Sequence, residues 1–122
     1  SKDIAILTRL KPEMVSASAF QPNAASDLRN HLAGDIELTL KVIALYRLLI
    51  PSNPMISCSS GLGVDGQIKC LNAGANVASV HITPTKFIDS FSMYQDSNRT
   101  TTDINTLVRL AKMTNLKLSE YT

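Results

Sequence analysis

The chain has 122 residues, and twelve Lys and Arg against ten Asp and Glu give a formal net charge of +2. This length suits one domain, spanning residues 1–122, and 44% hydrophobic with 18% charged residues is a soluble, globular balance. The charges are interspersed, which argues against a nucleic-acid surface. No apolar run approaches the ~20 residues that span a bilayer, and no signal-peptide pattern is visible. We therefore expect a cytoplasmic protein that binds neither nucleic acid nor membrane.

The first part of the chain predicts a short helix followed by a strand. The helix is weak and ends before Pro12, because the residue before a proline avoids helical angles. Residues 14–20 (MVSASAF) then alternate as in a strand, with Val15 on one face and Ser16 and Ser18 on the other.

A long loop and the clearest helix of the sequence come next. The loop from Gln21 to Asp35 exceeds the usual connection length, and such loops often carry function. Asp35 is a capping residue, and apolar residues then recur at helical spacing until Pro51. Their number predicts a helix that is mostly buried.

The second half of the chain repeats the alternation of strands and helices. Strands are expected at residues 55–60 and 75–83, a helix at 64–72 between them, and a final helix at 102–114. Strands that alternate with helices through short links imply parallel strands with right-handed crossovers. The fold class is therefore α/β, with about three parallel strands and a C-terminal helix.

Candidate site residues follow from a general rule, since parallel sheets and barrels bind ligands at the carboxyl ends of their strands. The rule selects small, neutral groups on all three strands. They are Ser16, Ser18 and Gln21 from the first strand, Cys58 and Ser60 from the second, and His81 and Thr83 from the third.

The serines along the first two strands are unusual, because a strand covered on both sides by helices should be apolar on both faces. One hypothesis is that this serine-bearing side lines a wet cavity, such as a barrel lumen that holds a polar ligand. The alternative is that the serines are hydrogen-bonded in the core or lie at a sheet edge. Both remain open on the sequence.

Several sharper interpretations are disfavoured by the sequence. Cys58 and His81 lack an acid that would orient the imidazole for a nucleophile–base pair. Two Cys and two His show no zinc-ligand spacing, so no metal site is expected, and we expect the thiols to be reduced. The glycine-rich stretch 61–66 lacks the acidic residue of a dinucleotide fingerprint. Aromatic residues after the third strand are expected to pack under the irregular segment rather than to stack on a ligand; they are Phe87, Phe91 and Tyr94.

The string from Leu45 to Pro84 resembles the C-terminal barrel region of radical S-adenosylmethionine enzymes of the biotin synthase and methylornithine synthase group. The marks are R-L-L-I-P at Arg47–Pro51, D-G-Q-x-K-x-L-N-A-G-A-N at Asp65–Asn76, and F-Q-P at Phe20–Pro22. The resemblance extends from about Lys11 to Leu118 and looks strong to methylornithine synthase.

The resemblance implies a partial (β/α) TIM barrel that belongs to a longer enzyme. In the family, the N-terminal half carries three cysteines that hold a [4Fe–4S] cluster, which binds S-adenosylmethionine and generates a 5′-deoxyadenosyl radical. That motif is absent here, so no cofactor is expected in this segment alone. The segment would complete the barrel together with an N-terminal half, supplied in cis or in trans, and would shape the pocket of a small-molecule substrate. The start at Ser1 reads as the middle of a longer chain.

One departure from the family pattern concerns the substrate. Methylornithine synthase grips its amino acid with a basic residue on the first of these strands, and with a serine and an acid on the second. The matching positions here are Ser16, Cys58 and Ser60, so a bulkier or less charged substrate fits better. Biosynthesis of the iron-only hydrogenase cofactor is one candidate role. The alternative is a stand-alone α/β module that binds or self-assembles, for example as a homodimer, because open sheet edges favour association.

Overall fold

The computed structural model describes residues 2–87, 90 and 102–119. Three parallel strands form one sheet in the order β1, β2, β3, which confirms the α/β class. The strands are β1 (Met14–Ser16), β2 (Met55–Cys58) and β3 (Val77–Ala78). The α-helices in the described ranges are α1 (Lys2–Leu10), α2 (Ile36–Leu49), α3 (Gly63–Asn72) and α4 (Ile104–Met113), with 3-10 turns η1 (Ser60–Leu62) and η2 (Thr85–Phe87). None of these helices has the length and apolar run that a membrane crossing requires.

Each strand is shorter than the sequence pattern predicts, because the chain finds other partners after each strand. Beyond β1, the Phe20 carbonyl accepts a hydrogen bond from Gly34 N at 2.7 Å, so this segment pairs with the end of its own loop. Beyond β3, His81 N donates to the Thr102 carbonyl at 2.8 Å. Alternation in the sequence reports which side faces the core, whereas strand length depends on these distant partners.

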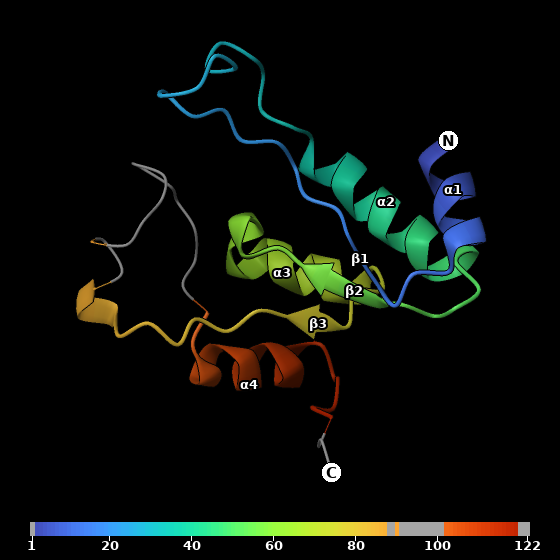
Figure 1. Cartoon of the computed structure of the whole chain (residues 1–122). Helices are drawn as coiled ribbons and strands as arrows, with labels where there is room; N and C mark the ends of the chain where they lie inside the picture. Colours follow the sequence, from blue (N-terminus) through green and yellow to red (C-terminus); the bar gives the residue numbers. More distant parts are fainter. Residues whose placement is uncertain (1, 88–89, 91–101, 120–122) are drawn as a thin grey trace.

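The core lies between the sheet and the helices. On β1 and β2 the alternation directs Val15, Ile56 and Cys58 toward this layer, where they are buried. Helix α3 lies between α2 and α4 and contacts both (Figure 1). These three helices complete the core with Ile43, Cys70, Leu71 and Leu110. The other face of the sheet begins with Met14 and Met55, both of which are exposed.

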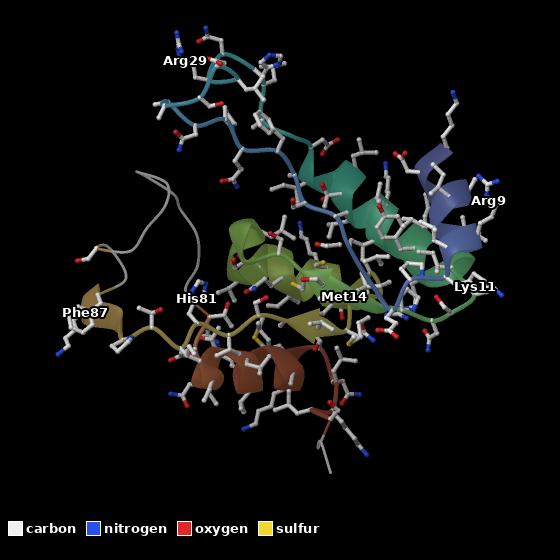
Figure 2. All side chains as sticks on the ribbon, in the orientation of Figure 1. Arg9, Lys11, Met14, Arg29, His81 and Phe87 are labelled. Carbon is white, nitrogen blue, oxygen red and sulfur yellow. The ribbon has the colours of Figure 1, made fainter. Side chains whose placement is uncertain are left out.

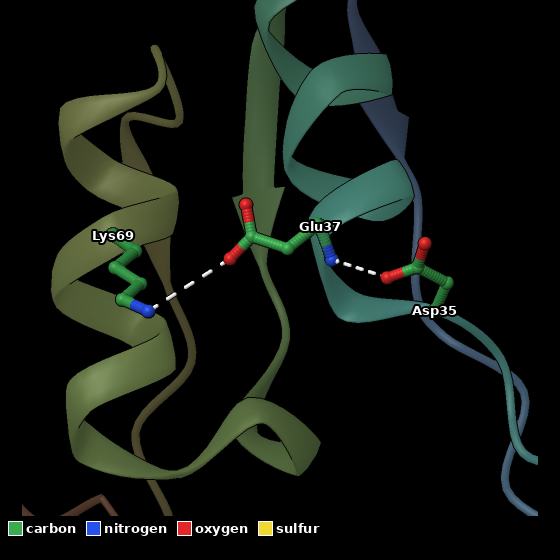
Figure 3. A network of polar contacts seen from close by, with 3 residues as sticks. All are labelled: Asp35, Glu37 and Lys69. Atoms are coloured by element: carbon green, nitrogen blue, oxygen red, sulfur yellow. Dashed lines mark hydrogen bonds and ion pairs between the residues drawn. The ribbon is translucent and has the colours of Figure 1, made fainter.

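Helix α2 begins as predicted but is less buried than expected. Asp35 caps it by accepting a hydrogen bond from Glu37 N at 2.8 Å. Glu37 also reaches Lys69 of α3 at 3.8 Å (Figure 3), an exposed ion pair of little energetic weight. Leu48 is 78% exposed and Leu38 59%, so the prediction of a mostly buried helix was wrong. The sequence shows only that residues are apolar, and here the described part of the chain covers only one side of the helix.

The turn between α3 and β3 requires a glycine. Gly74 has φ +119°, a conformation that side chains rarely adopt, and an added Cβ would lie 2.8 Å from the Cβ of Arg47. The guanidinium of Arg47 donates to the Gly74 carbonyl at 2.8 Å and also to the side chain of Asn53. Arg47 thereby ties the end of α2 to the turns that precede β2 and β3.

Asn76 extends the hydrogen bonding between β2 and β3 by one residue. Its backbone N donates to the Ile56 carbonyl at 3.0 Å, and its side-chain oxygen accepts from Ile56 N at 2.7 Å. The amide side chain therefore satisfies a strand N–H that β3 begins too late to reach.

Candidate functional site

A row of small side chains crosses the face of the sheet opposite the core. In the strand register Ser16 pairs with Ser57, and Ser57 pairs with Val77. Paired residues of parallel strands point to the same face, so these three side chains form one row. Ser16 is exposed and Ser57 half-buried, and neither carries a charge. We call the face that bears this row, together with Met14 and Met55, the open face.

At the carboxyl end of the sheet, the segments that follow β1 and β2 are joined. Gln21 Nε2 donates to the Gly61 carbonyl at 3.2 Å, and Gly61 N donates to Ser59 Oγ at 3.3 Å. Ser60 begins the 3-10 turn η1 and is half-buried. Thus Gln21 and Ser60, both predicted from the carboxyl-end rule, belong to neighbouring segments, and Ser59 contributes to the same turn.

The predicted residues beyond β3 lie on an exposed segment. His81 and Thr83 are both exposed, and His81 is labelled in Figure 2 on the chain between β3 and η2. The backbone of His81 is fixed by its hydrogen bond to Thr102, which leaves the imidazole exposed. Ser18 is likewise exposed, beyond the end of β1.

Cys58 does not lie on the open face. Its side chain lies on the same side of β2 as that of Ile56 and is 1% exposed. The thiol of Cys58 donates a hydrogen bond to the Gln67 carbonyl, with Sγ 3.6 Å from the oxygen. The carboxyl-end rule pointed to the end of β2, and there the side chain of Cys58 faces the core rather than the open face. Strand alternation counted from Ile56 identifies Ser57 instead, a residue that the list of candidates omitted. Since Cys58 is buried and His81 exposed, the structure does not join them as a nucleophile and base.

The two cysteines belong to the same buried cluster of the core, and each shifts the pKa of the other. The hydrogen bond to Cys70, burial and the charge of that neighbour together raise the pKa of Cys58 far above the usual thiol range. The pKa of Cys70 is lowered, because the Cys58 thiol can turn its single proton from the Gln67 carbonyl toward an ionised Cys70 sulfur and the Ser59 N–H also favours that thiolate, although burial opposes the shift. Cys58 is thus the thiol that keeps its proton.

A buried polar pair fixes the chain where it returns to the core. Gln67 of α3 and Thr102 are both fully buried. Gln67 Nε2 donates to Thr102 Oγ1 at 3.3 Å, and the Thr102 carbonyl accepts from His81 N. Gln67 therefore anchors, through Thr102, the segment that carries His81. Sequence reasoning noted Gln67 only as part of a motif.

The aromatic prediction is only partly covered by the structure. Phe87 is 44% exposed, with Lys86 Nζ 4.8 Å from its ring centroid, so it does not pack under a covering segment as expected. Phe91 and Tyr94 lie outside the described residues.

The described side chains do not fit an iron–sulfur cluster. Within residues 2–87, 90 and 102–119, no three His, Cys, Asp or Glu side chains converge as metal ligands. The thiols of Cys58 and Cys70 are buried against each other and the backbone. A cluster that used these two residues would require the core between β2 and α3 to open.

Comparisons with known proteins identify relatives of this chain, although no family model matches it. It is 31% identical over 94 residues to the [FeFe] hydrogenase maturase subunit HydE of Thermotoga maritima, covering 75% of this chain and 27% of that protein. It is 30% identical over 108 residues to the 3-methylornithine synthase of Methanosarcina barkeri, covering 87% of this chain and 31% of that protein. Over this segment, the chain belongs to the radical S-adenosylmethionine family of these enzymes. It spans about a third or less of the length of these relatives.

The solved structures agree on the fold. The crystal structure of methylornithine synthase superposes with a TM-score of 0.70 at 24% identity, over 96% of this chain and 35% of that one. The present chain therefore has the fold of a C-terminal piece of a TIM barrel.

Residues of the family motif in this sequence make hydrogen bonds that hold the fold together. Arg47 and Gly74 form the bridged turn before β3, and Asn76 supports β2. Gln67 holds Thr102. Arg47, Gln67 and Asn76 make these contacts through their side chains, and Gly74 takes a positive φ. They do not specify a substrate.

Proposed function

We propose that this chain forms the substrate-facing wall of a radical S-adenosylmethionine biosynthetic enzyme. The observation that carries the proposal is the row of Ser16 and Ser57 on the open face, in a segment related to such enzymes. In a barrel, this face would look into the lumen while the helices stay outside.

The wall would bind and orient a small molecule rather than start the chemistry. Hydroxyl groups on the open face donate or accept hydrogen bonds, and the exposed ends of the strands add further polar groups. Besides Ser57, the proposed contacts are Ser16, Ser18, Gln21, Ser60, His81 and Thr83. The [4Fe–4S] cluster and S-adenosylmethionine would be held by a partner half-barrel, in cis or in trans, and would supply the radical.

The neutral character of the open face favours a substrate of low charge. Neither Ser16 nor Ser57 can form the charge-assisted fork that holds an amino-acid carboxylate. One relative is a hydrogenase maturase, and cofactor biosynthesis for a hydrogenase is therefore the role that we favour over amino-acid rearrangement.

A chimera tests the proposal directly. This chain replaces the aligned segment of the Methanosarcina barkeri 3-methylornithine synthase, and the cluster is reconstituted anaerobically. We expect the chimera to cleave S-adenosylmethionine to 5′-deoxyadenosine, whereas the same enzyme without the segment does not. A chimera with a fully loaded cluster that yields no 5′-deoxyadenosine contradicts the proposal. The reading frame upstream of Ser1 is a second check, since a half-barrel supplied in cis predicts a cysteine triad there, and one supplied in trans predicts none.

A stand-alone, self-assembling module is the second candidate function. Strands β1 and β3 are both edges of the sheet, and exposed edges favour association. Apolar side chains such as Leu10 (69% exposed) and Leu48 (78%) are also uncovered by the described residues. Two copies could pair β1 with β3 and close a six-stranded barrel. Sedimentation that shows only monomer at high micromolar concentration excludes this candidate.

A further inference from the structure

The buried thiols of Cys58 and Cys70 lie where β2 contacts α3. Cys58 Sγ lies 3.6 Å from the carbonyl of Gln67, which is one helical turn before Cys70. The side chains are 1% and 0% exposed and belong to one buried cluster. Because helical side chains lean toward the preceding turn, the Cys70 side chain lies over the turn whose carbonyl Cys58 contacts. The two thiols are therefore neighbours in the core, although the residues come from separate elements.

We propose that Cys58 and Cys70 form a modification site, a buried dithiol that hydrogen peroxide converts into an intramolecular disulfide. The inference does not depend on the proposed enzyme function. It rests on the contact of Cys58 Sγ with the α3 backbone one turn before Cys70, and on the burial of both free thiols in one cluster.

The reaction transfers two electrons from the thiols to one peroxide molecule. The sulfur of Cys70, which accepts hydrogen bonds and ionises first, attacks a peroxide oxygen. The O–O bond breaks, water leaves, and Cys70 becomes a sulfenic acid. The sulfur of Cys58 then attacks the Cys70 sulfur, the S–O bond breaks, and the departing hydroxide takes the Cys58 proton as a second water. The net change is two thiols and one peroxide to one disulfide and two waters.

Access to the sulfurs requires a brief local opening, which the connection between β2 and α3 can provide. Residues 59–64 are half-buried, and no side chain caps the start of α3 at Leu62. Peroxide is small enough to enter through such an opening, whereas a bulky disulfide oxidant would leave a mixed disulfide that does not fit in the core. Once formed, the bond would fix α3 to β2 beside the turn that contains Ser59 and Gly61.

The test is oxidation of the folded, full chain. The protein is treated with hydrogen peroxide without denaturant, the excess is removed with catalase, and free thiols are labelled with iodoacetamide in guanidinium chloride. Trypsin cleaves after Arg47, Lys69 and Lys86, so the two cysteines fall on different peptides. We expect peptides 48–69 and 70–86 to be joined, with the loss of two hydrogen atoms in mass, and dithiothreitol to separate them.

A thermal melt distinguishes a native bond from one made in the unfolded chain. The oxidised monomer should keep its circular dichroism spectrum and unfold at a higher Tm than the reduced protein, because a native crosslink restricts the unfolded state. Cys58→Ala and Cys70→Ala should give no joined peptides and no rise in Tm. Full labelling of both thiols after peroxide treatment, crosslinks between chains, or a lower Tm of the oxidised monomer would each overturn the proposal.

Discussion

The two faces of the sheet differ in the side chains that they carry and in how far those side chains are buried. On the covered face, Val15, Ile56 and Cys58 pack against three helices, and each is nearly excluded from water. On the open face, Ser16 and Ser57 occupy the same strands and contribute no apolar contact to that core. The comparison indicates that the covered face holds the fold together, while the serines of the open face lie outside that core.

The largest effect on stability should appear when one residue on each face of the sheet is truncated to alanine. Ile56→Ala removes a fully buried side chain, and we expect a loss of about 2–5 kcal/mol in the free energy of unfolding. Ser57→Ala, its neighbour on the open face, should change stability by less than about 0.5 kcal/mol. Urea unfolding of both variants measures the difference. Comparable losses would mean that the open face is also structural.

Substitutions at the turn before β3, where Arg47 is bonded to Gly74, test how much the stability of the covered face depends on the backbone geometry of that turn. Gly74→Ala places a Cβ at positive φ and against Arg47, so we expect a loss of about 1–3 kcal/mol. Arg47→Gly removes the Cβ and Cγ that the new methyl group would meet, but not the strain at positive φ, and therefore Gly74→Ala should remain destabilising in that background. The double-mutant cycle separates the two causes. Full recovery in the double variant would show that backbone strain is negligible.

Asn76 tests the link between β2 and β3. Asn76→Ala leaves the half-buried Ile56 N–H without its acceptor, and a loss of about 1–2 kcal/mol is expected in chemical denaturation. Asn76→Asp keeps an oxygen acceptor and should lose less. Asn72→Ala, at an exposed position at the end of α3, is the matched control. If the Asp and Ala variants lost the same amount, the side-chain oxygen would not be the cause.

The smallest effect concerns the cap of α4, a helix of the covered face. Asp103 accepts a hydrogen bond from Thr106 N at 2.7 Å, and its hydrogen bonds with Thr106 lower the pKa of its carboxyl group. A lowered pKa in the folded state gives stability that is present above the unfolded pKa and lost as the pH falls through the folded value. Asp103→Ala should therefore destabilise at neutral pH and progressively less in acid. An equal effect of Asp103→Ala at pH 7 and pH 2.5 would exclude this titration as the cause.

Much of this fold was predictable because it depends on local patterns. The alternation around Val15 and Ile56 correctly identified the covered face, and Asp35 correctly marked the start of α2. The candidate site was only partly predictable. The carboxyl-end rule made Cys58 a candidate, but the structure buries its side chain on the core side and places Ser57 on the open face, because a rule for strand ends does not say which face a side chain takes.

The amino-acid sequence by itself determined the α/β class, the parallel order of units and the family motif, because periodicity, capping residues and turn glycines act over a few neighbouring residues. Only the tertiary structure decided which distant groups meet. Three contacts depend on how the elements pack together: the hydrogen bond of Arg47 to Gly74, the pair of Gln67 and Thr102, and the hydrogen bond of Cys58 to the Gln67 carbonyl. Strand lengths and the exposure of α2 were decided in the same way, since burial is a property of the assembled layers and not of any single segment.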